Sequence, residues 1–202
     1  MAYTRKNWEN RLLSRTDMSM YLTHLTKGTD KMNALEVLLR ILNEKKLKST
    51  CDTGFINGEK PVVCFQDIPF NSIAENVKHE QIERVNLGGK IRYEALGIAF
   101  DKSMIFKLGG RPVIYEKTIF AKGILSFNEH WRIVNLDYSD DEAYIDWTHE
   151  REWRILNDFN FELNDVFVLL PNTQVYKAFI KKCDTEIVQE IAGIIVLNTL
   201  IK

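Results

Sequence analysis

Short strand-like runs recur along this chain, and their order limits the folds open to it. They stand at residues 20–26 (MYLTHLT), 62–70, 91–100, 111–119, 151–158, 166–171 and 194–201. Runs of this length with many β-branched and aromatic residues predict strands. Helical patterns lie between some of them, but without the regular strand–helix alternation of a doubly wound parallel sheet. The order therefore predicts an α+β fold with a mixed sheet.

The clearest helix signal follows the first of these runs. Asn33 can cap a helix N-terminus, and Glu36 stands three residues later, in the position of a capping-box partner. Residues 33–46 then repeat leucine at helical spacing, which indicates one buried face. Further helices are expected at 72–85, within 101–110, at 173–183, at 185–192 and over parts of 125–135 and 140–147.

Composition limits the class of protein more than it defines it. The length of 202 residues suits one domain, and no linker-like stretch divides the sequence, so we expect a single domain over residues 1–202. Three cysteines without CxxC spacing support neither a disulfide framework nor a cysteine-rich zinc site. No secretory apolar core opens the chain, and no run of about 18 apolar residues occurs. We therefore expect a cytoplasmic protein that does not engage a membrane.

The motifs that are absent exclude several reaction classes. The sequence contains no GxxxxGK[ST], GxGxxG, GxSxG or HExxH pattern. None of the four histidines is paired with another at the spacing of metal ligands. Phosphate-loop, serine-hydrolase and metalloprotease chemistry therefore lack a sequence basis, and no metal is expected.

Residues 146–156, DWTHEREWRIL, concentrate charge around Glu150, Glu152 and Arg154. In a strand over this stretch, the period of two places these three side chains on one face and Trp153 on the other, towards the core. Two carboxylates on one face repel each other unless a cation compensates. The pairing gives no structural benefit, which favours a functional site in which Arg154 holds one carboxylate ionised. A solvated strand edge is the alternative interpretation.

Six segments in order, LTHLT, ALEVLLRIL, VVCFQDIP, GIAFDK, GGRPVIY and HEREWRI, resemble the bacterial abortive-infection family AbiGi. The resemblance spans residues 16–156, and CFQDIP and EREWR are its most specific parts. The layout is also similar to the ADP-ribosyltransferase superfamily, including the DarT toxins. That similarity implies a mainly antiparallel sheet core of ADP-ribosyltransferase type with flanking helices. It also implies an NAD-dependent effector or toxin of phage defence that modifies a nucleic acid or a protein.

The resemblance assigns a role to individual residues. Glu152 would be the catalytic glutamate and Glu150 its assistant. NAD, as a substrate, would be contacted by His24, Thr26, Phe65, Tyr93, Tyr115 and Arg154. A carboxylate beside the ribose stabilises an oxocarbenium-like transition state, and a second carboxylate can act as a general base towards the acceptor. An aromatic ring can stack on the cationic nicotinamide.

Two other interpretations stay open. Cys64 and Phe65 stand where these transferases carry a hydroxyl-bearing or aromatic middle motif, and AbiGi proteins are described as antitoxins. Both points favour a non-catalytic antitoxin or sensor that binds a cognate protein or a nucleotide. The basic clusters at 45–48 and 181–182 leave a nucleic-acid-directed enzyme as a third interpretation. Lysines near a helix C-terminus also suit the helix dipole, however, so they need no ligand.

Overall fold

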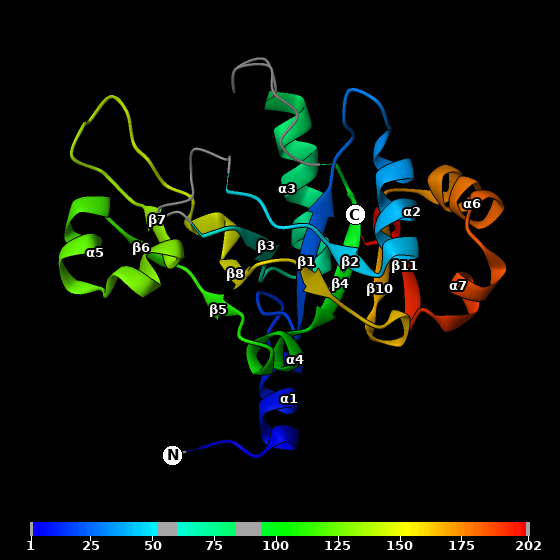
Figure 1. Ribbon diagram of the computed structural model, residues 1–202, viewed down its shortest axis with the longest axis horizontal. Helices are drawn as coiled ribbons and strands as arrows, with labels where there is room; N and C mark the ends of the chain where they lie inside the picture. Colours follow the sequence, from blue (N-terminus) through cyan, green and yellow to red (C-terminus); the bar gives the residue numbers. More distant parts are fainter. Residues whose placement is uncertain (1, 52–59, 84–93, 201–202) are drawn as a thin grey trace. The chain divides into compact units, whose positions relative to one another are not determined.

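The computed structural model describes residues 2–51, 60–83 and 94–200 (Figure 1). Its α-helices are α1 Arg5–Leu13, α2 Ala34–Glu44, α3 Phe70–Ile82, α4 Lys102–Lys107, α5 Thr118–Ile124, α6 Thr173–Lys182 and α7 Thr185–Glu190. Short 3-10 helices include η2 Phe127–Arg132, η3 Thr148–Glu150, η4 Leu163–Asp165 and η5 Leu197–Thr199.

The strands are β1 Tyr21–Thr26, β2 Lys46–Leu47, β3 Val62–Gln66, β4 Leu96–Asp101, β5 Arg111–Pro112, β6 Ile114–Glu116, β7 Ile133–Asn135, β8 Glu152–Leu156, β9 Phe159–Asn160, β10 Phe167–Leu170 and β11 Gly193–Val196. Contacts divide the chain into two compact units. Unit 1 holds residues 1–46, 68–102 and 161–202, and unit 2 holds residues 47–67 and 103–160. Each unit is assembled from stretches distant in sequence. The expectation of a single domain over residues 1–202 stays a prediction.

Unit 1 contains strands in the order β11-β10-β4-β1. β4 is antiparallel to both β1 and β10, and β10 is parallel to β11. Helix α3 packs against Ala99 and Leu169 on one face of these strands, together with Tyr21 and Leu25. Because successive side chains of a strand point to opposite faces, His24 lies on the other face.

Unit 2 contains strands in the order β3-β8-β5, with both pairings antiparallel, and a separate parallel pair of β6 and β7. Helix α5 packs against both β6 and β7. Taken unit by unit, the strands are mixed and mostly antiparallel, and helices flank them. The predicted α+β class is therefore confirmed, whereas the ADP-ribosyltransferase type of core stays a prediction.

Local sequence signals explain the best-predicted elements. The capping box of α2 is complete, because Asn33 Oδ1 accepts from the Glu36 backbone N–H at 3.0 Å and the Glu36 carboxylate accepts from the Asn33 backbone N–H at 3.1 Å. Asn172 caps α6, because its side chain accepts a hydrogen bond from the Val175 backbone N–H. The strands expected at 20–26, 62–70 and 166–171 are present as β1, β3 and β10.

Several expected elements were wrong, among them the strand expected over 194–201, which ends at Val196 before η5. No helix forms over 140–147, because the Asp140 and Asp146 carboxylates accept from backbone N–H groups two residues further on, and this favours turns. The single strand expected over 111–119 is divided into β5, β6 and the start of α5. Pro112 lies at the end of β5, where its missing N–H suits a strand terminus. Helix α1 was not expected, although Thr4 accepts from the Asn7 backbone N–H as its N-cap.

Gly97 marks a close approach of two backbones in unit 1. A Cβ at this position would lie 2.2 Å from the His24 carbonyl oxygen and 3.0 Å from Leu25 Cα. We expect Gly97→Ala to lower the free energy of unfolding by about 3 kcal/mol, because the clash is with backbone that must shift. Urea denaturation measures the change. The matched control is Gly123→Ala in α5, where nothing lies within 4 Å of the added Cβ. That variant is expected to gain about 0.5–1 kcal/mol from helix propensity.

Candidate functional site

One face of the β3–β8 pair in unit 2 is polar. The register places Cys64 opposite Arg154 and Gln66 opposite Glu152. These four side chains share a face because the strand period is two. Gln66 is 6% exposed and Arg154 only 1% exposed. Two of the four side chains are therefore withdrawn from solvent, and β8 pairs with β3 on one side and β5 on the other, which argues against a solvated strand edge.

Arg154 organises this face. Its Nε donates to Glu152 Oε1 at 2.7 Å, and Nη2 donates to Glu152 Oε2 at 3.2 Å. Its Nη1 donates to the backbone carbonyls of Trp131 at 2.6 Å and Ile133 at 3.4 Å. Burial opposes the positive charge, but the Glu152 carboxylate outweighs that effect and the pKa of the guanidinium is raised. Arg154 thus holds Glu152 in a two-point pair and ties β8 to η2 and β7.

The position of Glu150 corrects the strand interpretation of DWTHEREWRIL. Glu150 belongs to η3, and Arg151 takes the left-handed conformation (φ 44°, ψ 50°) before β8 begins at Glu152. The Glu150 carboxylate nevertheless reaches the polar face, since the Gln66 Nε2 donates to its Oε2. Gln66 therefore bonds one of the two carboxylates and lies opposite the residue that carries the other. A non-glycine residue in the left-handed region costs about 1 kcal/mol or more and is frequent at functional sites.

Tyr115 and Gln66 complete the cluster. The Glu152 backbone N–H donates to the Tyr115 hydroxyl at 2.7 Å. Burial raises the pKa of Tyr115 to about 12, and the charges of Glu152 and then Glu150 add to this. The hydroxyl is therefore a neutral donor at physiological pH. Gln66 Oε1 is buried and accepts no hydrogen bond from the part of the chain that the structure describes. A buried acceptor of this kind can receive a donor from a ligand.

The other predicted NAD-contacting residues are His24, Thr26, Phe65 and Tyr93. His24 and Thr26 belong to β1 in unit 1, so the structure does not test their proposed role beside the carboxylates. Phe65 is 1% exposed and packs edge-to-face on Phe159 at 6.0 Å, which makes it a core residue of unit 2 rather than the exposed wall of a pocket. Tyr93 lies outside the described residues. Of the predicted site residues, Glu150, Glu152, Tyr115 and Arg154 are brought together.

Three residues near the carboxylates were not assigned a role from the sequence. Gln66 is polar and buried within the apolar run VVCFQ, and its position two residues after Cys64 is the signal that could have found it. His149 Nε2 lies 3.5 Å from Glu150 Oε1, with the imidazole half exposed. Burial raises the pKa of the Cys64 thiol, and the Glu152 charge reinforces the effect. Cys64 is therefore a thiol and not a nucleophilic thiolate.

The chemistry open to this cluster follows from its charges. Two carboxylates, one buried cation, one neutral hydroxyl and one unsatisfied amide oxygen can stabilise a positive centre and accept protons. Within residues 2–51, 60–83 and 94–200, no three His, Cys, Asp or Glu side chains are placed to share a metal ion. In the same ranges, no helix has the length and apolar character needed to span a membrane.

Comparisons with known proteins supply no family for this chain. No family model matches it, and neither a curated protein nor a solved structure does.

Proposed function

We propose that this chain transfers ADP-ribose from NAD to a macromolecular acceptor, a protein or a nucleic acid, as an effector of bacterial phage defence. The observation that carries the proposal is that Gln66 bonds Glu150 and lies opposite Glu152, which is paired with the buried Arg154. A pair of carboxylates around one amide, with one of them clamped by a guanidinium, is a costly arrangement to bury. Such a cost is common where charge stabilises a reaction.

Glu152 is the better placed of the two carboxylates for contact with a substrate. Its side chain is 17% exposed, whereas that of Glu150 is 8% exposed. Arg154 fixes both Glu152 oxygens, so the carboxylate is oriented before a substrate arrives. In the proposed reaction it accepts a hydrogen bond from the ribose 2′-hydroxyl and stabilises the positive charge that develops on the ribose.

The proposed reaction is a substitution at the anomeric carbon of the nicotinamide ribose. The bond to the nicotinamide nitrogen breaks, and its electron pair leaves with neutral nicotinamide. A nucleophile of the acceptor forms the new bond to that carbon and gives its proton to Glu150, which acts as a general base. Gln66 Oε1 supplies a further acceptor for a hydroxyl or carboxamide donor of NAD. This substitution requires neither an oxidant nor a metal.

The test uses the full chain with NAD labelled on the adenylate phosphate. The labelled NAD is incubated with purified protein and, separately, with protein, RNA and DNA fractions of a bacterial lysate. We expect label to enter one of the macromolecular fractions and free nicotinamide to appear in equal amount. If nicotinamide release does not exceed that in buffer with any fraction, the transferase proposal is wrong.

A second candidate is a non-catalytic antitoxin or sensor, and one observation favours it. Both Glu152 oxygens already accept from Arg154, and Glu150 is bonded to Gln66, so each carboxylate has an internal partner. Such a cluster can simply hold η2, β7 and β8 together. Calorimetric titration of the chain with NAD separates the two candidates. Binding of NAD without release of nicotinamide favours the sensor, and release of nicotinamide favours the transferase.

A further inference from the structure

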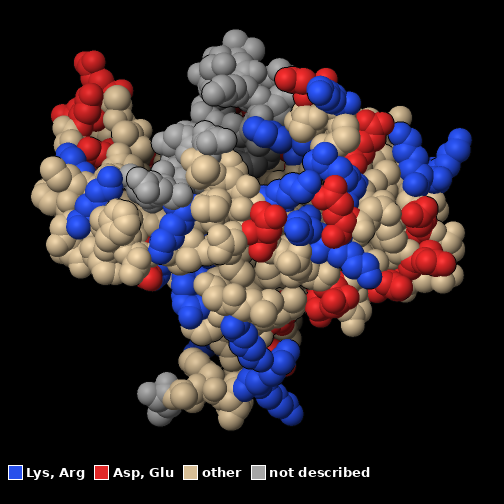
Figure 2. Space-filling view, viewed as in Figure 1, with Lys and Arg blue, Asp and Glu red and all other residues tan. Residues whose placement is uncertain are grey.

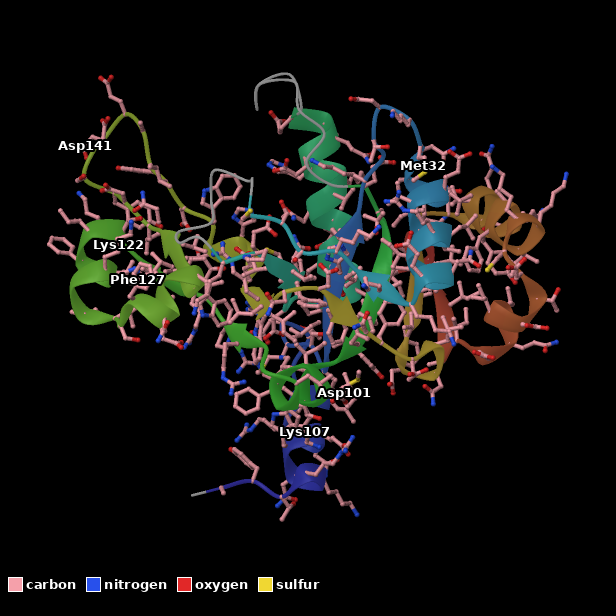
Figure 3. The ribbon with its side chains drawn as sticks, viewed as in Figure 1. Met32, Asp101, Lys107, Lys122, Phe127 and Asp141 are labelled. Carbon is pink, nitrogen blue, oxygen red and sulfur yellow. The ribbon has the colours of Figure 1, made fainter. Side chains whose placement is uncertain are left out.

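Unit 2 carries an exposed apolar surface on α5 and η2. Phe120 and Ile124 lie four residues apart and share a side of α5, Ile119 is next to Phe120 in the helix, and Phe127 opens η2 after the extended residues 125–126. They are 63%, 78%, 69% and 72% exposed, respectively. Figure 3 shows Phe127 and Lys122 on this segment. We call these four side chains the α5 face.

An acidic loop adjoins the α5 face. Residues 136–147 contain five carboxylates and no lysine or arginine. Lys117 is the N-cap residue of α5, and its Nζ lies 3.0 Å from Asp137 Oδ2 and 2.9 Å from Ser139 Oγ, which holds the loop against the helix. Tyr138 and Tyr144 stack edge-to-face at 5.2 Å and are 53% and 61% exposed. The combined surface is therefore apolar and aromatic with a negative border.

The exposed area is large enough to matter for association. Two aromatic rings of the α5 face, Phe120 and Phe127, and two of the loop, Tyr138 and Tyr144, together expose on the order of 500 Å². A stable protein–protein contact buries about 800 Å² on each partner. The surface thus supplies more than half of what one side of such a contact needs, and monomeric proteins rarely leave a larger patch open.

Helix α1 of the same sequence has the complementary character. Residues 1–16 carry four basic side chains, Arg5, Lys6, Arg11 and Arg15, against one acidic side chain. The structure of unit 1 buries only Leu12 of this nine-residue helix. Leu13 is 77% exposed and Tyr3 60% exposed. Figure 2 shows basic side chains gathered over α1, and acidic side chains over the loop at 136–147. A helix this short is marginal without packing partners.

We propose that the α5 face and its acidic loop bind helix α1 of a second copy of this chain. Leu13 and Tyr3 would cover apolar side chains such as Phe120 and Ile124. Lys6 and Arg11 would meet the loop, since Arg5 and Arg15 already pair with Glu9 and Asp17. Opposite charges at the border of an apolar contact steer association and fix its register. A two-fold arrangement makes this contact twice, and so closes the assembly as a dimer. The contact does not depend on the proposed NAD chemistry.

A charge-swap series measured by sedimentation velocity tests the proposal. We expect the wild-type chain to be dimeric at about 100 μM. Lys6→Glu/Arg11→Glu and Asp141→Lys/Glu142→Lys should each weaken the dimer at least about tenfold, because each places like charges together. The chain that carries all four substitutions should dimerise again, since both sides have been reversed.

Restoration in the fourfold variant distinguishes a lost contact from lost folding, and circular dichroism of each variant checks the fold directly. Phe120→Gln/Ile124→Gln should also weaken the dimer, at side chains that the monomer leaves exposed. Three results would overturn the proposal: a monomeric wild-type chain at that concentration, no restoration in the fourfold variant, or dimerisation unchanged by the α5 substitutions. The second or third result with a dimeric wild type would place the interface elsewhere.

Discussion

Arg154→Ala is expected to lower the free energy of unfolding by about 3–5 kcal/mol, the range for removing one partner of a buried ion pair. The substitution leaves the Glu152 carboxylate, 17% exposed, without its cation. It also leaves the Trp131 and Ile133 carbonyls without the Nη1 donor. Each of these groups then bears its own desolvation cost. Urea denaturation followed by tryptophan fluorescence measures the loss.

Arg15 provides the matched control. Its Nε and Nη2 donate to the two Asp17 carboxylate oxygens at 2.7 Å each, so the pair has the same two-point geometry. The two side chains are 53% and 49% exposed, however. We expect Arg15→Ala to cost no more than about 1 kcal/mol. Arg154→Lys should lose most of the stabilisation of the folded state, because a single ammonium cannot bond both carboxylate oxygens as the planar guanidinium does. Equal costs for Arg154→Ala and Arg15→Ala would contradict the role assigned to burial.

The sequence predicted the fold well where a local signal and the tertiary structure agree. Asn33 and Glu36 define the start of α2 through their own reciprocal bonds, which need no distant partner. The stretch 140–147 shows the opposite case. Its apolar residues recur every three or four positions, but the aspartate side chains bond to local backbone and form turns instead. Periodicity alone could not show which of these two local effects would prevail.

For the site, the strand period correctly paired Glu152 with Arg154, since both lie on β8. It failed for Glu150, because the left-handed turn at Arg151 separates that residue from the strand. Positive φ at an arginine has no sequence signature, unlike at glycine. Nor could the sequence identify the Trp131 carbonyl as a partner of Arg154, since it reaches the guanidinium only through the packing of unit 2.

If Glu152 stabilises the ribose cation, Glu152→Gln should reduce kcat for ADP-ribosyl transfer by about 10²–10³-fold. An amide keeps the shape of the side chain but provides no negative charge for the transition state. KM for NAD should change little, because the interaction strengthens only as the nicotinamide bond breaks. The rates come from nicotinamide release under saturating and limiting NAD.

Loss of structure is the main competing explanation for such a decrease, because Glu152 also neutralises the buried Arg154. The unfolding free energy of Glu152→Gln must therefore be measured beside its kinetics. Glu150→Gln is the informative companion, since Gln66 donates to the Glu150 carboxylate, whereas Arg154 forms its two-point pair with Glu152. A general base contributes about 10²–10⁴-fold to kcat. We therefore expect Glu150→Gln to lower kcat by that factor, and by less with acceptors that are already deprotonated. If a folded Glu152→Gln variant keeps the wild-type kcat, Glu152 takes no part in the reaction and its pair with Arg154 is purely structural.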